Sequence, residues 1–304
     1  MGRWVSMARI DEIKEVVVLS GKGGTGKTTV AGGMAWLCPE AVLCDCDVDA
    51  ANLELILGAD MIEEHEFRES RKARINPERC AGCGLCSKHC RFDAIADFRV
   101  DPFSCEGCGV CARICTLGAI EMTVNLSGHW FISRTDKGTL VHARLEPGEE
   151  NSGKLVSLVR REARLIAGRE GKKVIISDGP PGIGCPAISA LVDADLALIV
   201  TEPTLAAVHD LERVLDVCKH FAVAARVCIN RYDVHPANSD LIEDRCHREG
   251  IPVVSRIPYD EKVVEAAIKG QPVTAMDCRA GDAIRQLLDI VRRDLSVQCL
   301  SPEL

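Results

Sequence analysis

One short segment constrains this chain more than any other. Residues 21–28 read GKGGTGKT and match the phosphate-binding pattern G-x-x-x-x-G-K-[ST]. An apolar run at residues 16–19 precedes the segment and a helix-compatible run at residues 29–37 follows it, which is the context that the pattern requires. The glycines allow a tight turn and close approach to an anion, and the N–H groups at the helix start carry partial positive charge. We therefore predict a nucleotide-binding loop; the alternative is a glycine-rich turn that binds nothing.

The same pattern assigns roles to individual side chains. Lys27 is expected on the β- and γ-phosphates of ATP, and the Thr28 hydroxyl on Mg²⁺. The residues of this loop predicted to bind nucleotide are Gly21, Gly23, Gly24, Thr25, Gly26, Lys27, Thr28 and Thr29.

Aspartates end two further apolar runs. Residues 41–49 read AVLCDCDVD, in which Asp45, Asp47 and Asp49 alternate and so lie on one side of an extended chain. Residues 174–177 form a second apolar run, and Asp178 follows it in the arrangement of a Walker B aspartate. Converging carboxylates can hold Mg²⁺ and an attacking water. The structural alternative is that the acidic residues of the first run cap a strand exit.

Composition narrows the class of protein. With 304 residues, 47% of them hydrophobic, the chain can form one large α/β core and a small module. A formal charge of −8 argues against nucleic acid as the main ligand. No apolar run is long enough to span a bilayer and no signal-peptide core is present, so we expect a cytoplasmic protein without a membrane span.

Eight of the seventeen cysteines form two regular quartets. The motif C-x₂-C-x₂-C-x₃-C occurs twice, twenty-five residues apart, and the residues around it repeat as well. Regular quartets in a large chain without an export signal indicate metal ligands rather than disulfides. The first quartet is Cys80, Cys83, Cys86 and Cys90, and the second is Cys105, Cys108, Cys111 and Cys115.

This duplication resembles the bacterial ferredoxins that carry two [4Fe-4S] clusters. In that pattern the fourth cysteine of each run serves the other cluster, which implies one cluster on Cys80, Cys83, Cys86 and Cys115, and a second on Cys90, Cys105, Cys108 and Cys111. Zinc is the competing metal. The chain departs from the ferredoxin run at Arg91 and Thr116, which stand where proline normally follows the fourth cysteine.

Lys22 adds a second cation to the glycine loop. The resulting K-G-G-x-G-K-[ST] resembles the deviant loop of the superfamily that contains the MinD ATPases, the nitrogenase iron protein and the Mrp-type iron–sulfur carriers. The resemblance implies a nucleotide sandwich dimer, either of identical chains or of paired paralogues, in which Lys22 acts on the partner's ATP. A solvated lysine is the alternative.

The resemblance also implies roles elsewhere. Asp45 would belong to the Mg²⁺ shell and Asp47 would orient water, with a one-step ambiguity between Asp47 and Asp49. Asp178 would approach Mg²⁺ through water, and the Gly182 N–H would sense the γ-phosphate. The implied adenine contacts, which could equally be ordinary turn residues, are Asn230, Pro258 and Tyr259.

Two features outside these motifs are also informative. Residues 145–154 read LEPGEENSGK, include a possible cap for a helix at residues 155–166, and resemble the segment found here in ferredoxin-inserted ATPases. Cys185 lies seven residues after Asp178, as does a cluster ligand in the nitrogenase iron protein, although residues 127–173 offer no second ligand. A packing thiol is the alternative for Cys185.

Together these patterns predict a mostly parallel, doubly wound P-loop sheet with an inserted small α+β ferredoxin-like domain. The ATPase domain would comprise residues 1–70 and 127–304, and the insert residues 71–126. We expect a connector at residues 63–74, a hairpin of strands at 129–133 and 140–145, and buried parallel strands at 196–201, 226–230 and 252–257.

The function that this organisation favours is ATP hydrolysis coupled through dimer switching to electron transfer. The alternative is an Mrp-type ATPase that assembles or carries clusters or metal centres, and a third is MinD-like positioning. The implied partner is a redox protein or a metalloprotein client.

Overall fold

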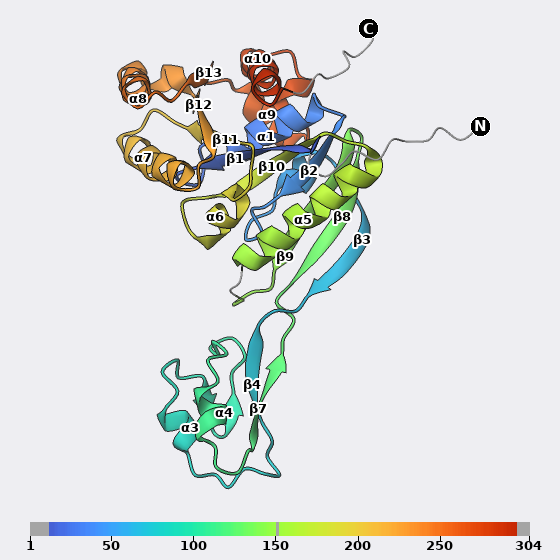
Figure 1. The fold of residues 1–304 in the computed structure, drawn as a ribbon, viewed down its shortest axis with the longest axis vertical. Helices are drawn as coiled ribbons and strands as arrows, with labels where there is room; N and C mark the ends of the chain where they lie inside the picture. The colour runs from blue at the N-terminus through green and yellow to red at the C-terminus, as the bar shows by residue number, and fades with distance from the viewer. Residues whose placement is uncertain (1–11, 150–151, 297–304) are drawn as a thin grey trace, which may run out of the picture. The chain divides into compact units, whose positions relative to one another are not determined.

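The computed structural model describes residues 12–149 and 152–296, which form two compact units (Figure 1). The larger unit contains residues 12–64, 131–143 and 152–296. The smaller contains residues 65–130 and 144–149, a wider range than the insert at 71–126 that the cysteine pattern suggested. Residues near 149 belong to it because the Glu149 carboxylate accepts hydrogen bonds from Ser70 and Asn125.

A sheet of nine strands is the framework of the larger unit, with the strand order β13-β12-β11-β1-β10-β2-β9-β8-β3. Its first six strands pair in parallel, and the apolar residues of the inner ones are buried because helices cover both faces (Figure 1). These strands are β13 (Val253–Ile257), β12 (Ala224–Asn230), β11 (Leu196–Thr201), β1 (Lys14–Ser20), β10 (Val174–Pro181) and β2 (Ala41–Asp45). The three parallel strands predicted after residue 195 are confirmed. The edge strand β13 was predicted to be buried, but Ile257 is its one buried residue.

Alternate residues of β1 face two different helical layers. Val16 and Val18 belong to a buried cluster with α1 (Lys27–Trp36) and α10 (Arg279–Asp294). Val17 and Leu19 are equally buried but lie outside that cluster. Two further helices, α5 (Ser152–Glu170) and α6 (Cys185–Leu191), pack on β2 and β10. The other elements of this unit are α2 (Leu53–Ile56), α7 (Leu205–His220), η2 (Tyr232–Val234), α8 (Pro236–Arg248), α9 (Lys262–Ile268) and η3 (Val273–Ala275).

The remaining strands of the sheet correct one prediction and confirm another. The predicted hairpin corresponds to β8 (Gly128–Thr135) and β9 (Gly138–Leu145), which are neighbours in the sheet. The prediction of a connector at residues 63–74 was wrong, because β3 (Asp60–Phe67) and β4 (Arg71–Ile75) occupy most of it. β3 lies at the edge of the sheet, where its charged side chains remain exposed, so hydrophobic periodicity carried no signal for it.

The smaller unit has α+β character. Its β4 pairs antiparallel with β7 (Ile120–Val124), and β5 (Ile95–Ala96) pairs with β6 (Arg99–Val100). The duplication in the sequence is a duplication in the structure: α3 (Leu85–Lys88) and α4 (Val110–Ile114) each begin after a left-handed glycine, at φ 72° for Gly84 and 73° for Gly109. The buried cluster of this unit consists of Ala73, Cys86, Ala94, Ile95, Cys105 and Ile120.

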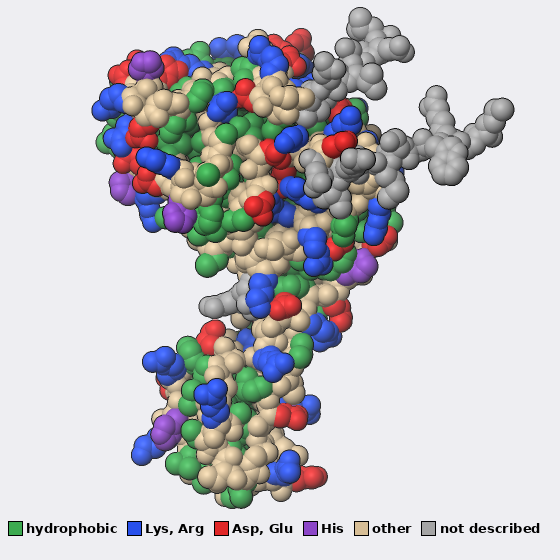
Figure 2. All heavy atoms as spheres, in the orientation of Figure 1, with side chains coloured by type: hydrophobic (Ala, Val, Ile, Leu, Met, Phe, Trp, Pro, Cys, Tyr) green, Lys and Arg blue, Asp and Glu red, His purple; other side chains and the backbone are tan. Residues whose placement is uncertain are grey.

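Charges of both signs are interspersed over the visible surface of the larger unit (Figure 2). On the smaller unit, hydrophobic side chains also reach the surface, and Phe98, Phe103 and Leu117 are each about half exposed or more. Every helix in the described ranges is too short or too polar to cross a bilayer.

Candidate functional site

The glycine loop connects β1 to α1 at the carboxyl end of the central strand. Gly24 and Gly26 have φ of 82° and 90°, in the left-handed region that favours glycine. A Cβ on Gly26 would lie 2.2 Å from Asn230 Nδ2, so the close approach of these segments also requires glycine there. A Cβ on Gly23 would have no neighbour within 4 Å, so close packing does not require glycine at that position.

Lys27 joins the loop to the two aspartate-bearing strands. Its Nζ lies 3.1 Å from Asp178 Oδ1 and 3.6 Å from Asp47 Oδ2. Burial by itself lowers the pKa of Lys27, but the negative charges of Asp178 and Asp47 outweigh it, so the pKa is raised and the ammonium stays charged. The structure thus brings together three of the residues that the sequence predicted for the site.

Asp45 has a more structural position than the sequence suggested. Its Oδ1 accepts the Asp47 N–H at 3.0 Å, and its Oδ2 accepts the N–H groups of Asn52 and Leu53 at 3.1 and 3.0 Å. Burial, followed by the charge of Asp178, raises the pKa of Asp45 to about 7. The carboxylate therefore organises the backbone that leads into α2, whatever it contributes to a metal shell.

Geometry also distinguishes Asp47 from Asp49. The Asp47 side chain is 17% exposed and faces Lys27, whereas Asp49 is an exposed residue. Of the two residues between which the pattern left an ambiguity, Asp47 is the one beside the glycine loop.

A cation fits this site on the evidence of a buried carboxylate oxygen. Asp178 is 1% exposed, and within the described residues its Oδ2 has no hydrogen-bond partner. Burial raises the pKa of Asp178, and the Lys27 ammonium opposes that effect without cancelling it. A buried carboxylate with an unsatisfied oxygen is unfavourable unless a ligand completes it. Mg²⁺ prefers oxygen ligands, so the Asp178 carboxylate and the Thr28 hydroxyl are suitable residues to hold it.

Lys22 is paired within its own chain. Its Nζ lies 2.7 Å from Glu202 Oε1 and donates to Thr204 Oγ1 at 3.2 Å. Glu202 lies 3.3 Å from Arg231 as well, so one carboxylate pairs with two cations. Lys22 must leave Glu202 before it can act on a second subunit.

Gly182 differs from the expectation for a γ-phosphate sensor. Its φ is 84°, but its N–H donates to Ser20 O at 2.8 Å, where the end of β10 joins β1. The predicted contact with phosphate therefore requires this hydrogen bond to be exchanged.

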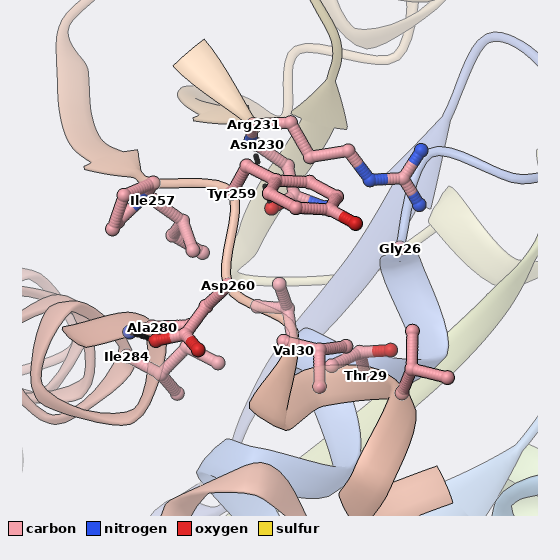
Figure 3. Close-up of a pocket in the computed structure, with 13 residues that line it drawn as sticks. Gly26, Thr29, Val30, Asn230, Arg231, Ile257, Tyr259, Asp260, Ala280 and Ile284 are labelled. Atoms are coloured by element: carbon pink, nitrogen blue, oxygen red, sulfur yellow. Dashed lines mark hydrogen bonds between the residues drawn. The ribbon is translucent and has the colours of Figure 1, made fainter. Parts of the chain in front are cut away.

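The three predicted adenine residues line one pocket (Figure 3). The pocket has a cavity volume of about 100 Å³ and is open to solvent. Asn230, Pro258 and Tyr259 line it together with Gly26 and Thr29 of the loop and helix start. Figure 3 shows Tyr259 on one side of the pocket and Thr29 on the other.

Arg231 lines the same pocket and was missed from the sequence. It has a left-handed φ of 54°, and its Nη2 donates to Gly24 O at 3.3 Å. Asn230 donates to Thr25 O at 2.7 Å, so two consecutive residues at the end of β12 support the glycine loop. The only available signal was the position of Arg231 directly after a strand-end asparagine.

All eight cysteines of the two quartets lie in the smaller unit. One pocket of this unit is lined by Cys90, Cys105, Cys108 and Cys111, which come from both runs and are the set that the ferredoxin resemblance assigns to one cluster. Every cysteine in the described part of the chain is a free thiol, and no group of three or more His, Cys, Asp or Glu side chains there is assembled as a metal site. Soft thiolate donors around a hollow fit an iron–sulfur cluster, and they also fit zinc.

Glycines beside these cysteines meet a steric requirement. Gly107 has φ 64°, and a Cβ there would lie 2.1 Å from the carbonyl oxygen of Arg71. Gly82, at the equivalent place in the first run, has a similar φ of 68°, but its nearest neighbour is the Phe98 side chain at 3.5 Å. The two halves of the duplication are therefore alike in backbone conformation and unlike in packing.

A buried ion pair next to the second cysteine run was also missed. Lys72 Nζ donates to Cys105 O at 2.9 Å and lies 3.1 Å from Glu149 Oε1. Burial works to raise the pKa of Glu149, but the hydrogen bonds from Ser70 and Lys72 prevail and lower it. Periodicity cannot detect a pair so distant in sequence; the one clue was that Glu149 lies in the segment at residues 145–154.

The remaining cysteines follow their surroundings. Cys44, Cys218 and Cys228 are buried and lie within apolar runs of the sequence. Cys185 is exposed at the first position of α6. The helix expected at residues 155–166 is present and longer, as α5 begins at Ser152; the cap residue proposed for it at position 151 lies outside the described residues.

Comparison with known proteins agrees with this geometry. Residues 16–273 match the family model described as the CobQ/CobB/MinD/ParA nucleotide binding domain. An uncharacterized protein of Methanocaldococcus jannaschii, MJ0578, is 36% identical over 229 residues, which cover 74% of this chain and 81% of that protein. The septum site-determining protein MinD of Neisseria meningitidis is 28% identical over 90% of this chain and 91% of its own.

Solved structures support the same fold. MinD of Pyrococcus horikoshii, solved in complex with Mg-ADP, superimposes with a TM-score of 0.57 at 19% identity, covering 92% of this chain and 96% of that one. The cell division ATPase MinD of Pyrococcus furiosus gives a TM-score of 0.56 at 20% identity, covering 92% and 98%. The chain therefore belongs to the CobQ/CobB/MinD/ParA nucleotide-binding domain family, as a P-loop ATPase of the MinD and ParA type.

Proposed function

We propose that this protein binds and hydrolyses ATP, and that the resulting switching of a dimer controls electron transfer through two [4Fe-4S] clusters. The observation that carries the proposal is the pocket lined by cysteines of both runs, in a chain whose other unit is a P-loop ATPase. An ATPase that acts only by switching has no need of eight thiolates arranged in a duplicated ferredoxin pattern.

The nucleotide half follows from the residues around the glycine loop. The loop N–H groups and Lys27 would hold the phosphates, and the solved complex of a family member with Mg-ADP supports Mg²⁺ as the accompanying cation. Thr28, Asp178 and Asp45 are the candidate metal residues, and Asp47, whose Oδ2 lies 3.6 Å from Lys27 Nζ, would orient water. Asn230, Pro258 and Tyr259 would contact the base.

The switching half depends on Lys22. ATP can close a dimer only through contacts that ADP cannot make, and a lysine reaching the partner's γ-phosphate is such a contact. In this chain the contact requires exchange of the Lys22–Glu202 pair for a phosphate. The partner subunit is a second copy or a paralogue.

The electron-transfer half depends on the smaller unit. One cluster would be held by Cys80, Cys83, Cys86 and Cys115, and the other by Cys90, Cys105, Cys108 and Cys111; when bound, such clusters supply one-electron carriers. An allosteric coupling of about 1–3 kcal/mol is ordinary. Since about 1.4 kcal/mol corresponds to about 59 mV for a one-electron couple, nucleotide binding could shift a potential by roughly 40–130 mV. A shift of that size can reverse the direction of transfer between closely matched carriers.

Anaerobic redox titration tests this proposal. The protein is purified without oxygen, its iron and sulfide are quantified, and both potentials are followed by EPR without nucleotide, with ADP and with a slowly hydrolysed ATP analogue. We expect about eight irons per chain and potentials that differ between ADP and the analogue. The Lys27→Ala variant, which keeps the clusters, is the control. If the potentials and the affinity for the partner do not change with nucleotide, control by ATP is rejected. If the purified protein contains no iron, the clusters are rejected.

A second candidate is a carrier that delivers a cluster or metal centre to a client. The exposed position of Cys185 favours it, because a thiol at the surface of each subunit could share a transferable cluster. Mössbauer spectra of Cys185→Ser separate the candidates. Loss of a third cluster signal supports the carrier, whereas unchanged spectra with nucleotide-dependent potentials support electron transfer.

A further inference from the structure

The Lys72–Glu149 pair lies beside the second cysteine run. The Lys72 ammonium donates a hydrogen bond to the carbonyl oxygen of Cys105, the first cysteine of that run. The chain therefore places one buried positive charge beside this cysteine set.

The pair is built as a fixed element rather than as a surface contact. The Lys72 side chain is 11% exposed and that of Glu149 is 5% exposed. The other hydrogen bonds of Glu149, from Ser70 Oγ at 2.5 Å and Asn125 Nδ2 at 2.9 Å, hold the carboxylate in place from β4 and β7 ends. Charges that are buried in this way are weakly screened and act strongly on a neighbouring redox group.

We propose that the Lys72–Glu149 pair sets the potential of the cluster on Cys90, Cys105, Cys108 and Cys111. The inference rests on the proposed function, because it requires that cluster. The physical reason is charge: reduction adds an electron, so the Lys72 ammonium favours the reduced form and the Glu149 carboxylate opposes it. Withdrawal of Glu149 leaves Lys72 uncompensated and raises that potential.

The potentials of charge variants test whether the Lys72–Glu149 pair sets the cluster potential. Lys72→Met should shift the oxidised-to-reduced ratio of this cluster at a fixed potential at least tenfold towards oxidised, which is about 59 mV for one electron. Glu149→Gln should shift the ratio in the opposite direction, and the double variant should lie between them. Lys72→Arg, which keeps the charge, should restore the wild-type ratio if Lys72→Met destabilises the unit.

Two internal controls make the measurement specific. The oxidised-to-reduced ratio of the other cluster, on Cys80, Cys83, Cys86 and Cys115, should change less than threefold in every variant. The ratios of both clusters should also change less than threefold in Lys88→Met, which removes an exposed lysine from α3. If either single variant shifts the oxidised-to-reduced ratios of both clusters equally, the pair has a merely structural role and the inference is overturned. The same holds if Lys72→Met and Glu149→Gln shift the ratio in the same direction. Unchanged ratios would overturn it as well.

The iron content of each variant separates this inference from the proposed function. Protein without iron overturns the proposed function, whereas about eight irons per chain with unshifted potentials overturn only the role of the Lys72–Glu149 pair.

Discussion

The two units of this protein are stabilised in different ways. The larger one buries whole strands and two helical layers, and its cluster around α1 and α10 contains residues from seven of the nine strands of its sheet. The smaller one has a buried cluster of only six residues, of which two are cysteines. Apolar burial is sufficient to fold the first, whereas a unit with so small a core usually requires metals or cross-links. We therefore expect the ATPase unit to hold its shape alone and the stability of the cysteine unit to depend on a group bound by its thiolates.

Removing iron gives the largest expected effect and tests that comparison directly. Treatment with an iron chelator under oxidising conditions should abolish amide protection in β4 and β7 while β1 and β10 keep theirs, because only the smaller unit loses part of its core. Hydrogen exchange measured by mass spectrometry reads both units at once. Equal protection of β4 and β7 with and without iron would contradict the comparison, and Cys185→Ser, outside the quartets, serves as the unaffected control.

Lys27→Ala should inactivate the larger unit without disturbing the smaller. Loss of an ammonium that stabilises charge on the transferring phosphoryl group is expected to lower the rate of ATP hydrolysis by about 10²–10³-fold. Phosphate release measures the rate, and the iron content and spectra of the variant should match the wild type. A variant that still hydrolyses ATP at a tenth of the normal rate would be inconsistent with the role given to Lys27.

Equivalent glycines of the duplication offer a sharper comparison within the smaller unit. Alanine at either Gly82 or Gly107 adopts a left-handed conformation, which costs roughly 1–2 kcal/mol. Only at Gly107 does the added methyl group also collide with a backbone oxygen, that of Arg71. We therefore expect Gly107→Ala to lower the free energy of unfolding of this unit by about 1–3 kcal/mol more than Gly82→Ala. Denaturant titration followed by cluster absorbance measures both; equal losses would mean that β4 shifts without penalty.

The smallest expected effect is a pH dependence of the larger unit. Because the pKa of Asp45 is raised to about 7, the native state binds more protons than the unfolded state between about pH 4 and pH 7. Stability should fall as pH rises through that window, by at most about 1.4 kcal/mol for each pH unit. Asp45→Asn should remove this dependence, and Mg²⁺ with ADP should reduce it by favouring the charged carboxylate. Urea titrations between pH 5 and pH 8 measure the slope, and a slope that survives in Asp45→Asn would assign it to other groups.

Much of the ATPase fold was predictable because its signals are local. The glycine loop, the apolar strands and the strand-end aspartates each occupy a few consecutive residues, so their residue types report their structure. The edge strand β3 was not predictable in the same way, since exposed charged residues are compatible with an edge and with a loop.

The candidate site was predictable in its members and less so in its contacts. The sequence indicated that Lys27, Asp47 and Asp178 would converge, and they do. It did not indicate that Asp45 would accept three backbone N–H groups or that Lys22 would pair with Glu202, because both depend on segments that come together only in the folded chain.

By itself the sequence determined the chemistry available to this protein: a phosphate-binding loop, aspartates at strand ends and two cysteine quartets. Only the tertiary structure decided which of these groups act on one another. Lys72 and Glu149 are 77 positions apart, and Arg231 lies far along the chain from the loop it supports. The physical reason is that the conformation of a motif depends on neighbouring residues, whereas the charge that a group experiences depends on every residue packed around it.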